Sequence, residues 1–240
     1  QAKGFLIGAT SGRTTLNGEG LQHQDGHSHI LSSTIPNCKS YDPAYGYELA
    51  AIIEYGLKEM YKDKKNYFYY LTVTNERYVQ PPKPKGKDVD SDIIKGMHRV
   101  SETKKPQIRL LGSGAILNES IKAAEILSDF GIESEVWSVS SFNMLRKDGM
   151  EVENENIKNP MKKAKESFVA KSFSEHDIPT VASTDYMRAY SEQIRPYINS
   201  PYYTLGTDGF GRSDSRAKLR EFFEVDARSI VMTAAYALNK

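Results

Sequence analysis

The second half of the chain alternates short apolar runs with amphipathic stretches, and this alternation restricts the fold more than any other feature. Apolar runs at 107–111, 135–139, 180–182 and 203–205 have the length of buried strands, and helical spacing of apolar residues separates them. Helical connections between consecutive strands imply right-handed crossovers and parallel pairing. The pattern predicts an α/β fold with a mostly parallel sheet.

The first half contains one further strand and one clear helix. The aromatic and apolar run at 67–73 predicts a strand that is buried on both faces. Before it, Asp42 and Pro43 suit the first positions of a helix, and apolar residues recur at helical spacing as far as Met60. Residues 1–37 show little periodicity, and we expect turns there around a short helix at 14–21.

A proline- and lysine-rich segment separates the two halves. Residues 80–87 are Gln-Pro-Pro-Lys-Pro-Lys-Gly-Lys, a composition that favours an extended and solvated connector. We therefore divide the chain into a first unit at 1–79, a linker at 80–105 and a second unit at 106–240. Within the linker we expect a helical turn at 92–97.

Charge and apolar content narrow the class of protein. The chain has 32 Lys and Arg against 31 Asp and Glu, which argues against a general nucleic-acid binder. No apolar run approaches the roughly 20 residues needed to cross a bilayer, and no signal-peptide pattern occurs. Cys38 is the single cysteine and cannot form an internal disulfide, so we expect a reducing, cytoplasmic location.

The densest chemical cluster is the segment Gln-His-Gln-Asp-Gly-His-Ser-His at 22–29. Three of the five histidines, His23, His27 and His29, lie within it beside Asp25. Because imidazoles titrate near neutral pH, the segment suits proton transfer or hydrogen bonding to a developing oxyanion. A metal site is an alternative interpretation, although no second cluster completes a ligand shell. A third is that these histidines only hydrogen-bond the fold.

A glycine-rich segment at 205–216 is the second candidate. It follows a predicted strand and precedes a predicted helix, where α/β proteins place ligand-binding loops. It matches neither the dinucleotide fingerprint nor the phosphate-binding loop. The plainer interpretation is a helix cap at Ser213 or Asp214, with Arg212 and Arg216 in surface ion pairs.

Several longer segments occur together in one order. They are Thr-Leu-Asn-Gly-Glu-Gly-Leu-Gln-His at 15–23, Asp-Gly-His-Ser-His at 25–29, Ile-Pro-Asn at 35–37, Ser-Tyr-Asp-Pro-Ala-Tyr at 40–45, Ala-Ser-Thr-Asp-Tyr-Met at 182–187 and Leu-Gly-Thr-Asp-Gly-Phe-Gly-Arg-Ser-Asp-Ser-Arg at 205–216. In these segments the chain resembles the homodimeric-type pyruvate dehydrogenase E1 component, a transketolase-like thiamine diphosphate enzyme. The resemblance extends over essentially the whole sequence.

The resemblance implies a fold and an activity. Residues 1–79 then form the C-terminal part of a pyrimidine-binding domain, and residues 106–240 form a transketolase C-terminal domain. The implied reaction is oxidative decarboxylation of pyruvate with thiamine diphosphate and Mg²⁺, followed by acetyl transfer to a lipoyl group. The implied partners are a second E1 subunit and the acyltransferase E2 of a multienzyme complex.

The resemblance also implies roles for the histidine segment. His23 matches the histidine that hydrogen-bonds the pyruvate-derived adduct, and His29 matches one near the reactive face of the cofactor. Asp25 and His27 are implied as orienting neighbours, in a second shell or in contact with the cofactor.

Two departures from the family pattern affect these expectations. The Gly-Asp-Gly start of the motif that holds Mg²⁺ and the diphosphate does not occur, and Gln24 stands where some relatives carry an acid. We therefore expect this chain to be a C-terminal portion that is inactive by itself. The alternatives are another thiamine enzyme such as transketolase, or a non-catalytic dimerisation or docking module.

Overall fold

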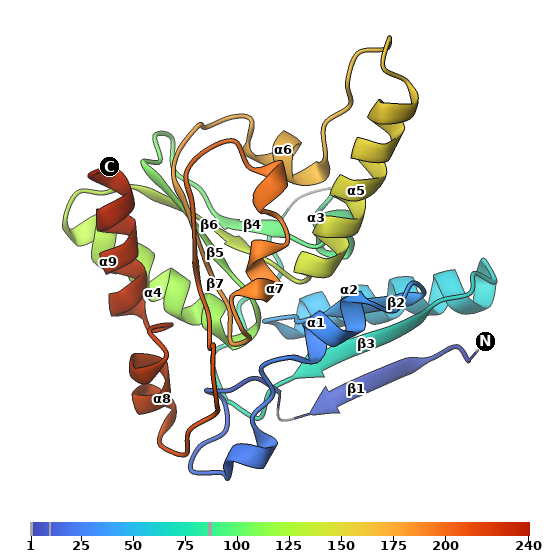
Figure 1. Ribbon diagram of the computed structural model, residues 1–240. Helices are drawn as coiled ribbons and strands as arrows, with labels where there is room; N and C mark the ends of the chain where they lie inside the picture. The colour runs from blue at the N-terminus through green and yellow to red at the C-terminus, as the bar shows by residue number, and fades with distance from the viewer. Residues whose placement is uncertain (1, 10, 86–87) are drawn as a thin grey trace.

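The computed structural model describes residues 2–9, 11–85 and 88–240. Two sheets lie one above the other in Figure 1, with the smaller one at the bottom and its strands in blue and teal. The larger sheet stands between two layers of helices, with α4 and α9 on one side and α5, α6 and α7 on the other. The α/β class predicted from the sequence is confirmed.

The smaller sheet has three parallel strands in the order β1-β3-β2. The strands are β1 (Phe5–Ala9), β2 (Cys38–Tyr41) and β3 (Phe68–Val73). The helical segments around them are η1 (Leu21–His23), α1 (Ser28–Ser33), α2 (Gly46–Leu57) and its π-helical continuation η2 (Lys58–Lys62). The strand predicted at 67–73 is present, and Tyr69 and Leu71 on one of its faces are fully buried. Phe68 and Tyr70 on the other face are only partly buried, so the expected burial of both faces is incomplete. That strand lies at the centre of the sheet.

The larger sheet has five strands in the order β4-β6-β5-β7-β8, parallel except for β4. The strands are β4 (His98–Ser101), β5 (Ile108–Gly112), β6 (Ser134–Ser138), β7 (Thr180–Ser183) and β8 (Tyr202–Leu205). The helices are α3 (Val89–Lys95), η3 (Gly114–Ile116), α4 (Leu117–Asp129), α5 (Phe142–Lys158), α6 (Phe168–Phe173), α7 (Ala189–Glu192), η4 (Arg195–Tyr197), α8 (Arg216–Phe222) and α9 (Ala227–Leu238).

The central strands of the larger sheet bury both faces. Leu110 packs in the core formed with α4 and α9, whereas its neighbour Leu111 packs in the core formed with α5, α6 and α7. Consecutive residues of a strand point to opposite faces, so a strand covered on both sides is mostly apolar. This explains why the continuous apolar runs in the sequence identified these strands. The buried ion pair of Arg109 on β5 with Glu135 on β6 is the charged exception in these two strands.

Two elements at the start of the chain differ from the prediction. The short helix expected at 14–21 is absent, and the only helical turn there is η1. The helix expected from Asp42 begins at Gly46. The Glu48 carboxylate accepts hydrogen bonds from the backbone N–H groups of Ala44, at 2.6 Å, and Tyr45, at 3.3 Å. Asp42 does not cap the helix, because its carboxylate instead accepts a hydrogen bond from Thr72.

The segment at 80–105 contains more regular structure than the helical turn expected at 92–97. Helix α3 occupies residues 89–95, and β4 then pairs with β6 as the antiparallel edge of the larger sheet. A strand of only four residues, of which His98, Arg99 and Ser101 are polar, gives little signal in the sequence. None of the helices among the described residues is both long enough and apolar enough to cross a membrane.

Buried hydrogen bonds join the two sheets. The Glu48 carboxylate on α2 accepts from His98 Nε2 at 2.8 Å and from the Ser138 hydroxyl at 2.6 Å. Asn143 on α5 donates to the carbonyl of His29 at 2.8 Å. Since these groups are shielded from water, breaking one bond leaves a buried polar group without its partner. The first unit is therefore held firmly against the second.

Candidate functional site

The histidine segment lies where loops from the two sheets meet. The loop after β1 begins beside the carboxyl end of β3, because the Ser11 N–H donates to the carbonyl of Val73 at 3.3 Å. It then crosses to the loops that follow β7 and β8 in the larger sheet (Figure 1). The carboxyl ends of parallel strands are the usual position of ligand loops in α/β proteins.

A buried aspartate holds the first part of this loop. The Thr14 N–H donates to both carboxylate oxygens of Asp185 at 3.1 Å, and the Arg13 N–H donates to the Asp185 carbonyl at 3.3 Å. Burial raises the pKa of Asp185 to about 6, against the opposing effect of its hydrogen bond with Thr14. Gly12 has φ +83°, and a Cβ there would lie 2.1 Å from an Asp185 carboxylate oxygen. The close approach therefore requires glycine.

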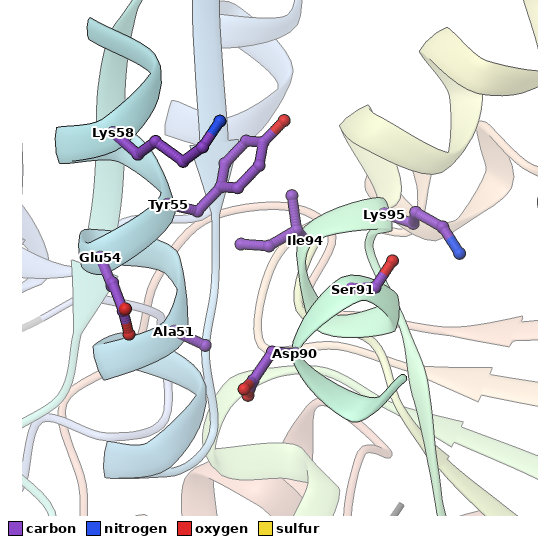
Figure 2. Close-up of a pocket in the computed structure, with 8 residues that line it drawn as sticks. All are labelled: Ala51, Glu54, Tyr55, Lys58, Asp90, Ser91, Ile94 and Lys95. Atoms are coloured by element: carbon purple, nitrogen blue, oxygen red, sulfur yellow. The ribbon is translucent and has the colours of Figure 1, made fainter. Parts of the chain in front are cut away.

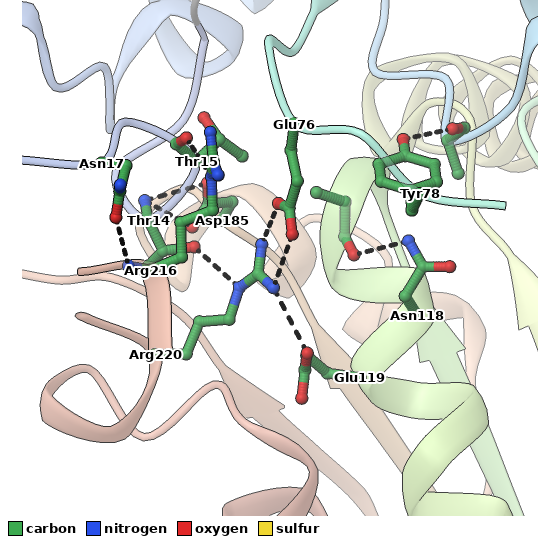
Figure 3. Close-up of polar contacts among 12 residues, drawn as sticks. Thr14, Thr15, Asn17, Glu76, Tyr78, Asn118, Glu119, Asp185, Arg216 and Arg220 are labelled. Atoms are coloured by element: carbon green, nitrogen blue, oxygen red, sulfur yellow. Dashed lines mark hydrogen bonds and ion pairs between the residues drawn. The ribbon is translucent and has the colours of Figure 1, made fainter. Parts of the chain in front are cut away.

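Helix α8 holds the same loop through Arg220 (Figure 3). Its guanidinium donates from Nε to Thr14 Oγ1 at 3.2 Å and from Nη1 to Glu76 at 3.1 Å and Glu119 at 3.3 Å. Nη2 donates to the second oxygen of Glu76. The Arg220 side chain is 8% exposed, so this arginine connects the loop, the segment after β3 and helix α4 inside the protein.

The 205–216 loop contacts the histidine loop directly. The Gln24 side chain pairs with the backbone of Arg212, since its Oε1 accepts from the N–H at 2.7 Å and its Nε2 donates to the carbonyl. The Gly18 N–H donates to the carbonyl of Asp214 at 2.9 Å. An acid in place of Gln24 accepts from the N–H but cannot donate to the carbonyl. The amide at this position therefore fastens one loop to the other.

The expectations for the 205–216 loop need correction. The residue that caps α8 is Ser215, whose hydroxyl accepts from the Lys218 N–H at 3.4 Å, and not Ser213 or Asp214. Arg216 forms no ion pair within the described residues and instead donates from Nε to the carbonyl of Thr15 at 2.7 Å. Arg212 lies over the ring of Phe222 at 5.2 Å. Contacts with the first unit could not be inferred from a local charge pattern.

Two of the four predicted site residues face solvent. His23 ends the turn η1 and His27 precedes α1, and both side chains are exposed. Asp25 lies between them and is half-buried. Its carboxylate accepts from the backbone N–H groups of His27, at 3.0 Å, and Ser28, at 2.9 Å, and from the Ser28 hydroxyl. Asp25 therefore fixes the backbone at the start of α1.

The fourth residue, His29, is enclosed by the chain itself. It is 0% exposed, and its ring stacks on Tyr190 with 4.8 Å between ring centres and meets Tyr186 edge-on at 4.7 Å. Its Nε2 lies 2.9 Å from Thr72 Oγ1. Burial lowers the pKa of His29 to about 3, against the opposing charge of Asp25, so the imidazole is neutral at physiological pH. The structure thus separates His29 from the exposed His23 and His27.

Sequence reasoning did not identify the buried polar residues around the loop. Asp185 and Asp42 lie in segments that resemble the E1 family, but the local pattern indicated a role only for Asp42, as a helix cap. Arg220 and Glu76 give no signal in the sequence, because they are 144 positions apart and neither belongs to a motif. Across residues 2–9, 11–85 and 88–240, no group of three or more His, Cys, Asp or Glu could hold a metal ion.

A separate pocket of about 470 Å³ opens between α2 and α3 (Figure 2). Tyr55 and Ile94 project into it from the two helices. Two lysines on its rim already pair with acids, Lys58 with Asp63 at 2.6 Å and Lys95 with Asp92 at 3.2 Å. Its lining contains no residue of the two candidate loops, and we assign no ligand to it.

Comparison with known proteins gives matches over both units. The model of the pyruvate dehydrogenase E1 component middle domain matches residues 1–81, and that of the transketolase-like C-terminal domain matches residues 96–226. The pyruvate dehydrogenase E1 component of Pseudomonas aeruginosa is 56% identical over 99% of this chain. That of Escherichia coli K12 is 52% identical over 100% of it. The chain spans 27% of the length of each of these curated relatives.

Solved transketolases share the fold. A transketolase variant from Pichia stipitis superimposes with a TM-score of 0.72 at 16% identity, covering 98% of this chain and 30% of its own. A split-gene transketolase described as an inactive beta4 tetramer gives 0.66 at 16% identity, covering 98% of this chain and 66% of its own. The chain therefore belongs to the transketolase-like family, and within it to the pyruvate dehydrogenase E1 components, of which it carries the middle-domain and C-terminal-domain region.

Proposed function

We propose that the chain forms part of a pyruvate dehydrogenase E1 enzyme, which decarboxylates pyruvate oxidatively and transfers the acetyl group to a lipoyl group of a partner acyltransferase. The observation that carries this proposal is the identity above 50% over essentially the whole chain to proteins named pyruvate dehydrogenase E1 component. The anchored loop that presents His23 to solvent supports it.

Thiamine diphosphate is the cofactor of this proposal, and when bound it supplies an electron sink for the carbanion left by decarboxylation. The residues here suit its reactive side, because the exposed imidazoles of His23 and His27 are accessible to a bound molecule. His23 would donate a hydrogen bond to the oxygen of the pyruvate substrate, where negative charge develops. Asp25 keeps the segment in place, and His27 orients its neighbours.

His29 belongs to the same site in this proposal, close to the reactive face of the cofactor. Since it is neutral and shielded from solvent, its part is to orient groups by hydrogen bonding. Mg²⁺ accompanies the diphosphate in the proposed holoenzyme. Because the described residues offer no set of metal ligands, we assign no Mg²⁺ ligand to this chain.

The proposed assembly is a homodimer within a cytoplasmic complex, with the lipoyl acyltransferase E2 as partner and no nucleic acid or membrane. The isolated 240 residues are inactive in this proposal, as the description of the split-gene transketolase as inactive suggests by analogy. Thiamine-dependent decarboxylation of pyruvate by the isolated chain would show this part of the proposal to be wrong.

The test uses a longer protein that contains this chain and is as long as the curated relatives, and it replaces His23 in that protein. His23→Ala should lower kcat for pyruvate by about 10²–10³-fold, as expected for losing a donor to a developing oxyanion, without changing the assembly. Gln22→Ala is the matched control, since Gln22 is exposed on the same turn. Unchanged kcat in His23→Ala would favour a non-catalytic dimerisation or docking module. Turnover of a sugar phosphate instead of pyruvate would favour transketolase.

A further inference from the structure

A fully buried polar cluster lies between the two sheets. His29 on α1, Thr72 on β3 and Asp42 at the end of β2 are each at most 2% exposed. Tyr186 and Tyr190 cover the His29 ring from the second unit. Because water does not reach these groups, the hydrogen bonds among them determine where each proton lies.

The Thr72 hydroxyl determines the direction of the hydrogen bonds in this cluster, because it has only one proton to donate. Three groups lie within hydrogen-bond distance of its Oγ1: a carboxylate oxygen of Asp42 at 2.7 Å, the carbonyl of Tyr41 at 3.3 Å and Nε2 of His29 at 2.9 Å. The carbonyl is always an acceptor, and so is the carboxylate when ionised. While Asp42 is ionised, the hydroxyl proton therefore points away from His29, to the closer Asp42 carboxylate.

The ring nitrogen must then supply the proton of the remaining bond. We propose that Asp42, acting through Thr72, is a positioning residue that holds His29 in the tautomer with the proton on Nε2 and the lone pair on Nδ1. A neutral imidazole has a single N–H, and burial lowers the pKa of His29 to about 3, so the ring stays neutral at physiological pH.

The other ring nitrogen then becomes a buried acceptor. Nδ1 has no hydrogen-bond partner among the described residues. Its lone pair is therefore available to accept one hydrogen bond from a donor outside these contacts. The consequence for catalysis rests on the E1 reaction proposed above. In that reaction His29 orients a neighbouring group by accepting a hydrogen bond at Nδ1, whereas His23 is the imidazole that donates a hydrogen bond.

The tautomer can be measured directly by nitrogen NMR on the chain with ¹⁵N-labelled histidine. The chain has five histidines, and His29→Gln identifies the signals of His29 by their loss. The spectrum is recorded at about pH 9, above the pKa of about 7 to which burial raises Asp42, so that the carboxylate is ionised. The proposal predicts the chemical shift of a protonated nitrogen for Nε2 and of an unprotonated one for Nδ1.

Variants of Thr72 test the pathway. Thr72→Ser keeps the hydroxyl and should leave both shifts unchanged, whereas Thr72→Val removes it and should bring both shifts toward intermediate values as the tautomers mix. A proton on Nδ1 in the wild type, or unchanged shifts in Thr72→Val, would overturn the proposal. If Thr72→Val fails to fold, the wild-type tautomer still decides. No measurement here requires turnover, so failure of the proposed E1 activity leaves the result interpretable.

Discussion

Arg220 offers the sharpest test of how the histidine loop is held. Its guanidinium lies between Glu76 and Glu119, whose side chains are 17% and 8% exposed, and it also donates to Thr14. Replacing it with Met keeps an unbranched apolar stem but leaves Glu76 without this cation. Removing one partner of a buried ion pair typically costs about 3–5 kcal/mol. Glu119 keeps Lys122, at 2.9 Å, and the Ala227 N–H, at 3.1 Å.

We therefore expect Arg220→Met to lower the free energy of unfolding by about 3 kcal/mol, the low end of that range. Lys218→Met on the same helix is the control, since it removes only an exposed ion pair with Glu221 and should leave the free energy of unfolding nearly unchanged. Urea unfolding followed by the fluorescence of Trp137 measures both. Arg220→Lys keeps the charge without the planar fork and should lose roughly half as much.

Amide hydrogen exchange provides a second measurement on the same variants. The Thr14 N–H donates to Asp185 inside the protein, so it is protected while the loop is closed. Arg220→Met should lower this protection and Lys218→Met should not. Equal stability losses in the two variants, with unchanged exchange at Thr14, would refute the role of Arg220 as the anchor of the loop.

Three further predictions concern buried groups and loop contacts. Folding lowers the pKa of His29 to about 3, so the contribution of His29 to stability decreases as the pH falls below about 6.5. Folding raises the pKa of Asp42 to about 7, so the contribution of Asp42 to stability decreases as the pH rises above about 4. The two contributions oppose each other between about pH 4 and 6.5, where the raised pKa of Asp185 also acts. Relative to wild type, the slope of the urea midpoint against pH should therefore become more positive in Asp42→Asn and more negative in His29→Gln. Unchanged slopes in both variants would contradict the burial argument. Gln24→Glu removes the donor to the Arg212 carbonyl and should speed proteolysis of the 205–216 loop without changing the urea midpoint; an unchanged cleavage rate would contradict that contact. Gly12→Ala should destabilise by at least about 1 kcal/mol because of its positive φ and the nearby Asp185 oxygen, and a neutral result by urea unfolding would show that the loop moves freely.

The architecture could be predicted from the sequence where a local pattern carries the signal. The strand at β5 is apolar on both faces, and its core neighbours lie on adjacent strands, so the run itself reveals the buried sheet. Strand β4 was missed because four residues with polar members resemble a loop. Asp42 was misassigned because a buried partner, Thr72, outweighed the local preference for a helix cap.

The candidate site could be predicted only in part for the same reason. The three closely spaced histidines indicated the position of the loop, and the longer segments that resemble the E1 family indicated the family. Sequence alone could not separate the exposed His23 from the enclosed His29, because burial depends on Tyr186 and Tyr190 from the other unit. The Arg220 contacts with Glu76 and Thr14 likewise join residues 144 and 206 positions apart.

The role proposed for His23 can be tested most directly by a crystal structure with thiamine diphosphate and a stable pyruvate-derived adduct bound. The protein for this structure contains this chain and is as long as the curated relatives. A ring nitrogen of His23 should lie within about 2.7–3.1 Å of the adduct oxygen, as for a donor to a developing oxyanion. A His23 ring that points to bulk solvent in that complex, with the adduct oxygen hydrogen-bonded to other groups, would contradict it.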